Sequence, residues 1–263
     1  TTANDNTAVG YAAFEANTSG TRGVAIGAYA LDSNTTGSDN TAVGYGVMGG
    51  NTTGAQNTAI GRSALTANTT ADNNTAVGYL ALTANTTGAN NNAFGATALD
   101  ANTTGNSNNA FGSEALSDNT TGTQNCAFGH EALEDNNADD NTAFGFRALR
   151  LTTTGTDNVA VGSRALQANT TGDGNTAVGM FALLNATTAD NNVAMGYAAL
   201  VSSTTGYSNV SLGHNSCYGL TTGYQNTVIG KDAMVAGTTY ARCTAIGFQA
   251  LYNNTANDVT AVG

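Results

Sequence analysis

The sequence predicts an all-β fold, a parallel β-solenoid (β-roll or β-helix) of about fifteen 17-residue coils. A glycine recurs from Gly10 to Gly263, and thirteen of the fifteen intervals are 17 residues while two are 16. The residue before this glycine is always large and apolar. Asn stands four positions before it in 13 of 16 repeats, and Ala stands two positions before it in 14 of 16. Such a fixed period with repeating columns is typical of chains that stack one unit on the next.

Each repeat is expected to hold one short strand, Asn-Thr-Ala-Val-Gly. A second extended piece is expected around Ala-Leu, and turns are expected in Asn-Thr-Thr-Gly, because Asn and Gly adopt left-handed turn conformations readily. A pair of helices does not fit, since helical repeats need about 33 residues or more. The handedness of the coil stays open.

Stacking places equal residues of successive coils about 4.8 Å apart. The sequence therefore predicts ladders of identical side chains. The structural Asn ladder, in which each amide bonds its neighbours, comprises Asn40, Asn57, Asn74, Asn91, Asn108 and Asn125. The apolar ladder comprises Val43, Ile60, Val77, Phe94, Phe111, Phe128, Leu65, Leu82 and Leu99. The phenylalanines at 94, 111, 128 and 144 are expected to stack.

Two arrangements of the strand remain open. Side chains alternate along a strand, so the residue before the glycine lies on one face and the small residues on the other. Either the large apolar residues or the small ones fill the coil. In both cases an outer face suits a partner, which favours a homo-oligomer. Residues 1–263 are expected to form a single uncapped repeat array that belongs to a longer fibre.

Composition narrows the function classes. Seven basic and eighteen acidic residues give a net charge of −11, and the chain has no basic stripe, so nucleic-acid binding is not expected. No apolar run approaches the length of a membrane span, so no membrane insertion is expected. No nucleophile–base set, P-loop or repeated acidic ligand pattern appears, so we expect no enzyme activity, no cofactor and no metal site. The histidines, His130 and His214, stand five coils apart.

Several columns suggest other properties. Cys126, Cys217 and Cys243 fall in three different columns and are expected to stay unpaired. A Thr column eight residues after the glycine, at regular spacing, suggests ice binding as one alternative function. Uncapped ends suggest a self-assembling extracellular filament, stacked head to tail, as another. Tyrosines between residues 207 and 240 suggest a sugar-contacting patch. The turns also contain candidate glycan acceptors, which are Asn34, Asn51, Asn85 and Asn102.

Two stretches carry a family resemblance. Residues 40–45 and 74–79 both read Asn-Thr-Ala-Val-Gly-Tyr, and an Asn-Thr-Thr-Gly-type turn follows each. These units resemble the repeats of tail-fibre-type surface proteins and are similar to the head repeats of trimeric autotransporter adhesins. The resemblance implies a trimeric left-handed parallel β-roll on a cell surface or virion. The expected function is that of an extracellular, non-enzymatic fibre, a shaft or head for attachment, with itself and a cell-surface glycan or receptor as partners.

Overall fold

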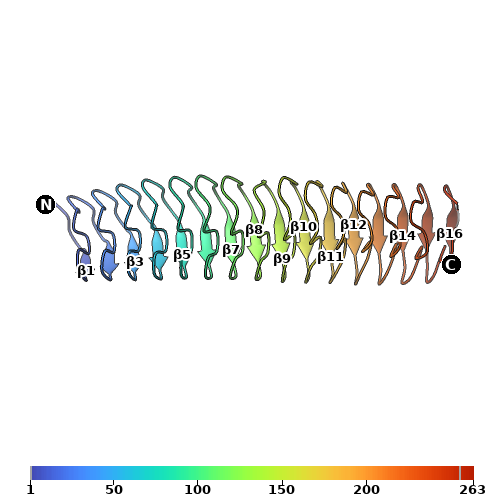
Figure 1. The fold of residues 1–263 in the computed structure, drawn as a ribbon, viewed down its shortest axis with the longest axis horizontal. Coiled ribbons are helices and arrows are strands. Elements are labelled where there is room, and N and C mark those ends of the chain that lie inside the picture. The colour runs from blue at the N-terminus through green and yellow to red at the C-terminus, as the bar shows by residue number, and fades with distance from the viewer. Residues whose placement is uncertain (1, 255) are drawn as a thin grey trace. The chain divides into compact units, whose positions relative to one another are not determined.

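The computed structural model describes residues 2–254 and 256–263. The described residues form sixteen strands of three residues each, paired in parallel and in chain order within one sheet. Successive strands begin 16 or 17 residues apart, so each coil contributes one strand (Figure 1). This arrangement confirms the predicted all-β parallel solenoid.

The chain divides into two compact units, residues 1–130 and 131–263. The first unit holds β1 (Thr7–Val9), β2 (Val24–Ile26), β3 (Thr41–Val43), β4 (Thr58–Ile60), β5 (Thr75–Val77), β6 (Asn92–Phe94), β7 (Asn109–Phe111) and β8 (Cys126–Phe128). The second holds β9 (Thr142–Phe144), β10 (Val159–Val161), β11 (Thr176–Val178), β12 (Val193–Met195), β13 (Val210–Leu212), β14 (Thr227–Ile229), β15 (Thr244–Ile246) and β16 (Thr260–Val262). That residues 1–263 behave as one uninterrupted array stays a prediction.

The register of the sheet aligns equal positions of the repeat. In the pair β3 and β4, Ala42 lies opposite Ala59 and Val43 lies opposite Ile60. The hydrogen bonding continues past the strand, because the Gly44 N–H donates to the Ile26 carbonyl of the preceding coil at 2.8 Å. Each column of the repeat is therefore a ladder in space.

Alanine and leucine fill the inside of most coils. In the fourth coil the middle strand residue Ala59 is fully buried, as are Ala64 and Leu65 after the glycine. The residue before the glycine points outward, and Ile60 is 41% exposed. Neither arrangement left open by the sequence holds as stated, because the small strand residue and the leucine lie inside together and only the residue before the glycine lies outside. The predicted apolar ladder separates into an inner column (Leu65, Leu82, Leu99) and an outer one (Val43, Ile60, Val77, Phe94, Phe111, Phe128).

The second extended piece expected around Ala-Leu is not a strand. Residues 62–67 form turns, and the Leu65 backbone is left-handed, with a φ of 52°. Ser63 and Asn73 of the same coil also have a positive φ, of 57° and 61°. These conformations cost about 1–3 kcal/mol each for residues other than glycine.

The left-handed residues direct their N–H groups along the stack. Ser63 and Asn73 donate to carbonyls of the preceding coil at 3.0 and 3.2 Å, whereas Leu65 donates to a carbonyl of the following coil at 3.0 Å. The hydrogen bonds between coils therefore hold the strained bends in place. This explains why a coil with one short strand still bonds to both of its neighbours.

The repeat glycine is required for two reasons. Gly61 has a φ of 128°, which side-chain-bearing residues rarely adopt, and a Cβ built on it would lie 2.4 Å from the Gly78 carbonyl oxygen. The close approach of the two backbones leaves no room for a side chain. Glycine at this column thus fixes the distance between coils.

The predicted Asn ladder is present and buried, and several of its amides bond to one another as expected, such as Asn175 Nδ2 to Asn158 Oδ1 at 3.1 Å. The amides also bond to backbone. The Asn74 N–H donates to Asn57 Oδ1, and Asn74 Oδ1 accepts the Asn91 N–H, both at 2.9 Å. Asn74 Nδ2 donates to the Gly88 carbonyl, also at 2.9 Å. The side chains therefore bond to backbone as well as to one another, because the amide reaches across the coil to the next turn.

A second Asn ladder lies in the turns of the first unit. Asn102 Nδ2 donates to Asn85 Oδ1 at 2.8 Å, and Asn85 Nδ2 donates to Asn68 Oδ1 at 3.1 Å. Here too the amides bond to one another along the stack. Asn85 Nδ2 also donates to the Gly88 carbonyl at 2.9 Å, so both ladders meet at one turn.

Within the second unit this turn column is irregular. Thr152 and Ser203 occupy it, and the hydroxyl groups of both are buried without a hydrogen-bond partner among the described residues. A buried polar group without a partner lowers stability. The ladder before the strand, by contrast, continues through Asn158, Asn175, Asn192, Asn209 and Asn226.

The 16-residue coils are shortened at the turn. In the usual coil the turn Asn donates to a carbonyl three residues later, as Asn85 does. In the short coil after Gly129, Asn136 Nδ2 donates to the Ala138 carbonyl, only two residues later, at 3.0 Å. The turn absorbs the missing residue, and the strand and core columns keep their register.

We expect Asn192→Ala to lower the free energy of unfolding by about 2–4 kcal/mol, because it leaves two buried backbone groups without partners. Asn192 Nδ2 donates to the Gly206 carbonyl at 2.8 Å, and Asn192 Oδ1 accepts the Asn209 N–H at 3.0 Å. Urea unfolding followed by circular dichroism measures the change.

The matched control is Asn185→Ala in the same coil. Asn185 is exposed, and the preceding coil carries Ala168 at the equivalent position, so its effect should stay within about 0.5 kcal/mol. Equal effects of the two substitutions would contradict the structural role of the ladder.

Candidate functional site

The strand face is the side of the sheet formed by the first and third residues of each strand. Its third residues form the outer apolar column of each unit. In the first unit these are Val9, Ile26, Val43, Ile60, Val77, Phe94, Phe111 and Phe128, and in the second they are Phe144, Val161, Val178, Met195, Leu212, Ile229, Ile246 and Val262. Exposed fractions such as 50% for Phe128 and 49% for Met195 show that these side chains face solvent. A contiguous exposed apolar patch is typical of an interaction surface.

The strand face carries no charged side chain in any of the sixteen strands of the described part of the chain. The first residues are Thr, Val, Asn or Cys, and the third are Val, Ile, Phe, Met or Leu. The chain as a whole contains eighteen acidic residues. Charge is therefore kept off this one face, as it is at the centre of protein interfaces.

The predicted aromatic stack forms on the strand face of the first unit. The rings of Phe94 and Phe111 lie 4.7 Å apart at 8°, and those of Phe111 and Phe128 lie 5.0 Å apart at 20°. Stacking leaves one edge of each ring exposed. The three phenylalanines thus form a flat aromatic section of the outer apolar column.

The candidate glycan acceptors lie inside the coils. Asn34, Asn51, Asn85 and Asn102 are fully buried, and their Nδ2 groups donate within the turn ladder. A glycan is attached through Nδ2, so it would have to displace these bonds and open the core. This placement speaks against glycans on the folded chain. The same four residues belong to the second Asn ladder, a role that the sequence did not indicate.

The Thr column uses its hydroxyl groups internally. Thr52 Oγ1 donates to the Thr69 carbonyl at 3.0 Å, and Thr86 Oγ1 donates to the Thr103 carbonyl at 3.0 Å. These residues are only half-exposed. Their hydroxyl groups thus add hydrogen bonds between coils and are not presented as a free ordered array.

The cysteines are unpaired in the structure, as expected. Cys217 takes the inner leucine position, is fully buried, and burial raises its pKa to about 12. Cys243 replaces an Asn of the ladder, and its N–H donates to Asn226 Oδ1 at 2.9 Å. Cys126 is half-exposed on the strand face, and burial raises its pKa as well.

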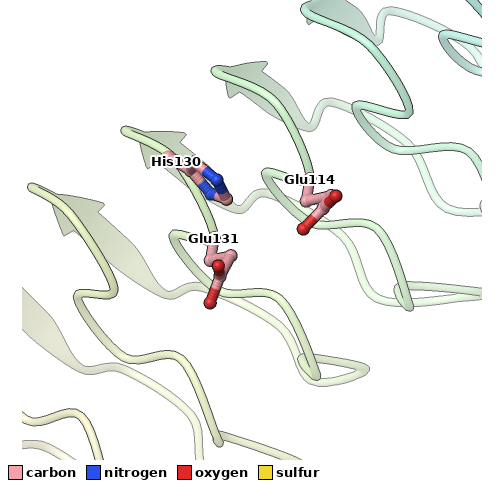
Figure 2. Close-up of side chains that lie close together, drawn as sticks. All are labelled: Glu114, His130 and Glu131. Carbon is pink, nitrogen blue, oxygen red and sulfur yellow. The ribbon is translucent and has the colours of Figure 1, made fainter.

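Three side chains that could hold a metal ion come close together. Figure 2 shows Glu114, His130 and Glu131, whose ligand atoms lie within 4.8 Å of one another. Glu131 forms ion pairs with two arginines. Its Oε2 lies 2.7 Å from Arg147 Nε and 2.8 Å from Arg150 Nε. The negative charge of Glu131 is therefore compensated by arginines of the chain itself. The other histidine, His214, stacks on Tyr197 at 5.2 Å.

The tyrosine cluster expected between residues 207 and 240 separates into two places. Tyr207 and Tyr224 stack at 4.9 Å and 3° in the turns of successive coils. Tyr218 instead lies beside Tyr197 in the lining of a cavity. The sequence predicted a tyrosine patch between residues 207 and 240. It did not predict that Tyr218 and Tyr197 line the same cavity, because Tyr197 precedes the stretch where the columns change.

No protein-family model matches the chain, and no curated protein sequence matches it. Within the described residues there is also no helix that is both long enough and apolar enough to cross a bilayer. The strand face and the cavity are therefore the two features of the chain that bear on its function.

We expect a thiol-alkylating reagent at pH 8 to leave Cys217 unlabelled in the folded chain and to label it once urea is added. The thiolate is the reactive form, and burial suppresses it at Cys217. Because the folded state holds this thiol neutral, the free energy of unfolding should fall as the pH rises above the unfolded thiol's value of about 8.5 toward 12. Mass spectrometry of digests identifies the labelled site, and equal labelling rates of Cys217 with and without urea would contradict its burial.

We expect no thermal hysteresis in cold solutions of the chain, because the hydroxyl groups of the Thr column donate to backbone carbonyls of the neighbouring coils. Nanolitre osmometry measures the gap between melting and freezing, with bovine serum albumin at equal mass as the control. A gap that grows with protein concentration would support the ice-binding alternative.

Proposed function

We propose that the chain is a non-enzymatic structural and adhesive part, a shaft or head, of an extracellular attachment fibre. Its copies associate through the strand face into a homotrimer. The repeats resemble those of tail-fibre-type proteins and trimeric adhesin heads, which supports a place on a cell surface or virion. A cell-surface glycan or receptor is then the partner that the fibre contacts.

The observation that carries this proposal is the uncharged strand face. Each coil adds one large apolar side chain to the outer apolar column, at the spacing of paired strands, about 4.8 Å. Burial of such a side chain stabilises by about 1.5–3 kcal/mol. A second copy brings an identical column, as symmetric oligomers require.

The charge distribution supports self-association in particular. Copies with a net charge of −11 repel one another over most of their surface. The strand face lacks charge, so two copies can approach there without bringing like charges together. The small, uncharged first residues, such as Thr58 and Thr75, let the neighbouring backbone come close.

We expect the purified chain to sediment as a stable mass of three chains across a concentration series. The double substitution Ile60→Lys/Phe94→Lys should shift it to the mass of one chain, because two charges per copy would be buried in the interface. Circular dichroism should stay unchanged, since both side chains point outward. Sedimentation velocity measures the mass.

The control is Thr70→Lys/Thr104→Lys, which adds the same charge at the same two-coil spacing on exposed turn residues. It should leave the trimer intact. A wild-type chain that sediments as a monomer would contradict self-association. Open-ended growth with concentration would favour the alternative, a filament that stacks head to tail.

A further inference from the structure

The second unit contains an open cavity of about 580 Å³ on the turn side of four successive coils. Arg164, Phe181, Ala198 and Asn215 occupy the same column, two residues after the repeat glycine, and all four line the cavity. Ala198 is 3% exposed and lies between bulkier neighbours of the column. The hollow thus arises because one coil carries a methyl group where the coil before it carries an aromatic ring.

Aromatic rings line the cavity next to Ala198. The rings of Phe181 and Tyr197 lie 5.8 Å apart, edge to face at 74°. The ring of Tyr197 also stacks on His214, at 5.2 Å and 16°. Tyr218 lines the cavity from the following coil and is 46% exposed. Tyrosines offer an apolar face together with a hydrogen-bonding hydroxyl group.

Arg164 brings a positive charge to the same cavity. The structure gives its guanidinium no ion pair and no hydrogen bond within the described part of the chain, whereas Arg22, Arg147 and Arg242 each pair with a carboxylate. Its one recorded partner is the Phe146 ring, 5.9 Å from the guanidinium carbon. A guanidinium binds a carboxylate through two parallel hydrogen bonds.

The polar group opposite is an amide. Asn215 Nδ2 donates to Asp232 Oδ1 at 3.2 Å, which orients the side chain and leaves its oxygen as an acceptor for a hydroxyl group. Leu184 and Val201 complete the lining with apolar surface. The cavity therefore combines one cation, one amide acceptor and ring faces, within the usual volume range of about 300–1,000 Å³ for ligand sites.

We propose that this cavity binds a carboxylate-bearing sugar, such as a hexuronate at the end of an acidic polysaccharide. The carboxylate pairs with Arg164, an apolar face of the sugar ring packs on Tyr197 or Tyr218, and a sugar hydroxyl group donates to Asn215. The proposal rests on the attachment function above, and it names the chemical class of the ligand.

The probes are methyl β-D-glucuronide and methyl β-D-glucoside, which differ at the carboxylate, and benzoate, which has a carboxylate but no sugar ring. NMR titration of the whole chain should show saturable binding of the glucuronide. The glucoside and benzoate should each bind at least tenfold more weakly. Equal binding of either one would overturn the assignment of an acidic sugar, and so would a failure of the glucuronide to bind.

Two variants locate the binding. Arg164→Gln should weaken glucuronide binding at least tenfold and leave glucoside binding unchanged. Ala198→Phe should fill the hollow and abolish binding. Bulky residues fit this column, because Phe181 and Tyr29 occupy it with a φ of 63° and 59° beside 53° for Ala198. Circular dichroism verifies the fold of each variant.

The matched controls lie in the first unit. Arg62→Gln removes another guanidinium, one that lies over Tyr79 at 5.9 Å, and Ala12→Phe adds a ring at the column of Ala198. Both should bind the glucuronide as the wild type does. Unchanged binding in Arg164→Gln or Ala198→Phe would overturn the site. The NMR titration and the sedimentation experiment test the two proposals separately. A trimer that does not bind the glucuronide would contradict only the sugar site. A monomer that binds it would contradict only the fibre.

Discussion

The hydrogen bonding of the Asn carboxamide that precedes most strands is the interaction on which the rest of the structure depends. In the first unit, the Asn74 carboxamide accepts from the Asn91 N–H of the following coil and donates to the Gly88 carbonyl of the next turn, and the Asn74 N–H donates to the Asn57 carboxamide of the preceding coil. A hydrogen bond between neutral groups contributes only about 0.5–1.5 kcal/mol net, but a missing buried partner costs more. Because each amide bonds to more than one group, the buried Asn side chains and the backbone around them satisfy one another's hydrogen bonds.

This buried hydrogen bonding explains why few apolar residues are sufficient to stabilise the coil. The interior of a coil such as the one around Ala59 and Leu65 contains small side chains, so little apolar area is buried. The backbone compensates through left-handed bends that point N–H groups at both neighbours, as at Ser63 and Leu65. Gly61 then sets the separation at which these bonds form. The large apolar residues that precede the repeat glycines, such as Ile60, are not needed in the core and lie on the strand face.

The period of the repeat was sufficient to predict the parallel solenoid and the place of its strand, because 17 residues with a central glycine exclude helices. Which side of the strand faces inward could not be predicted, since both Ala59 and Ile60 lie in regular apolar columns.

The buried role of Asn85 was hidden because its Asn-Thr-Thr motif is also a glycosylation motif. Its spacing to Gly88, repeated in successive coils, was the signal that could have revealed it. The cavity at Ala198 depends on differences between neighbouring coils, which a consensus view of the repeat averages away. The pairing of Ser211 with Ser216, at 3.0 Å from hydroxyl to carbonyl, shows such a local compensation inside the core.

The shortened turn at Asn136 has a consequence for protein engineering. This corner accommodates a change in chain length while the amide still finds a carbonyl, two residues away instead of three. A corner that tolerates deletion in this way is the position at which a guest peptide can be grafted without disturbing the columns on either side. Because the coils repeat, equivalent corners recur at the stacking distance, and epitopes inserted there would be displayed as an evenly spaced, single-file array.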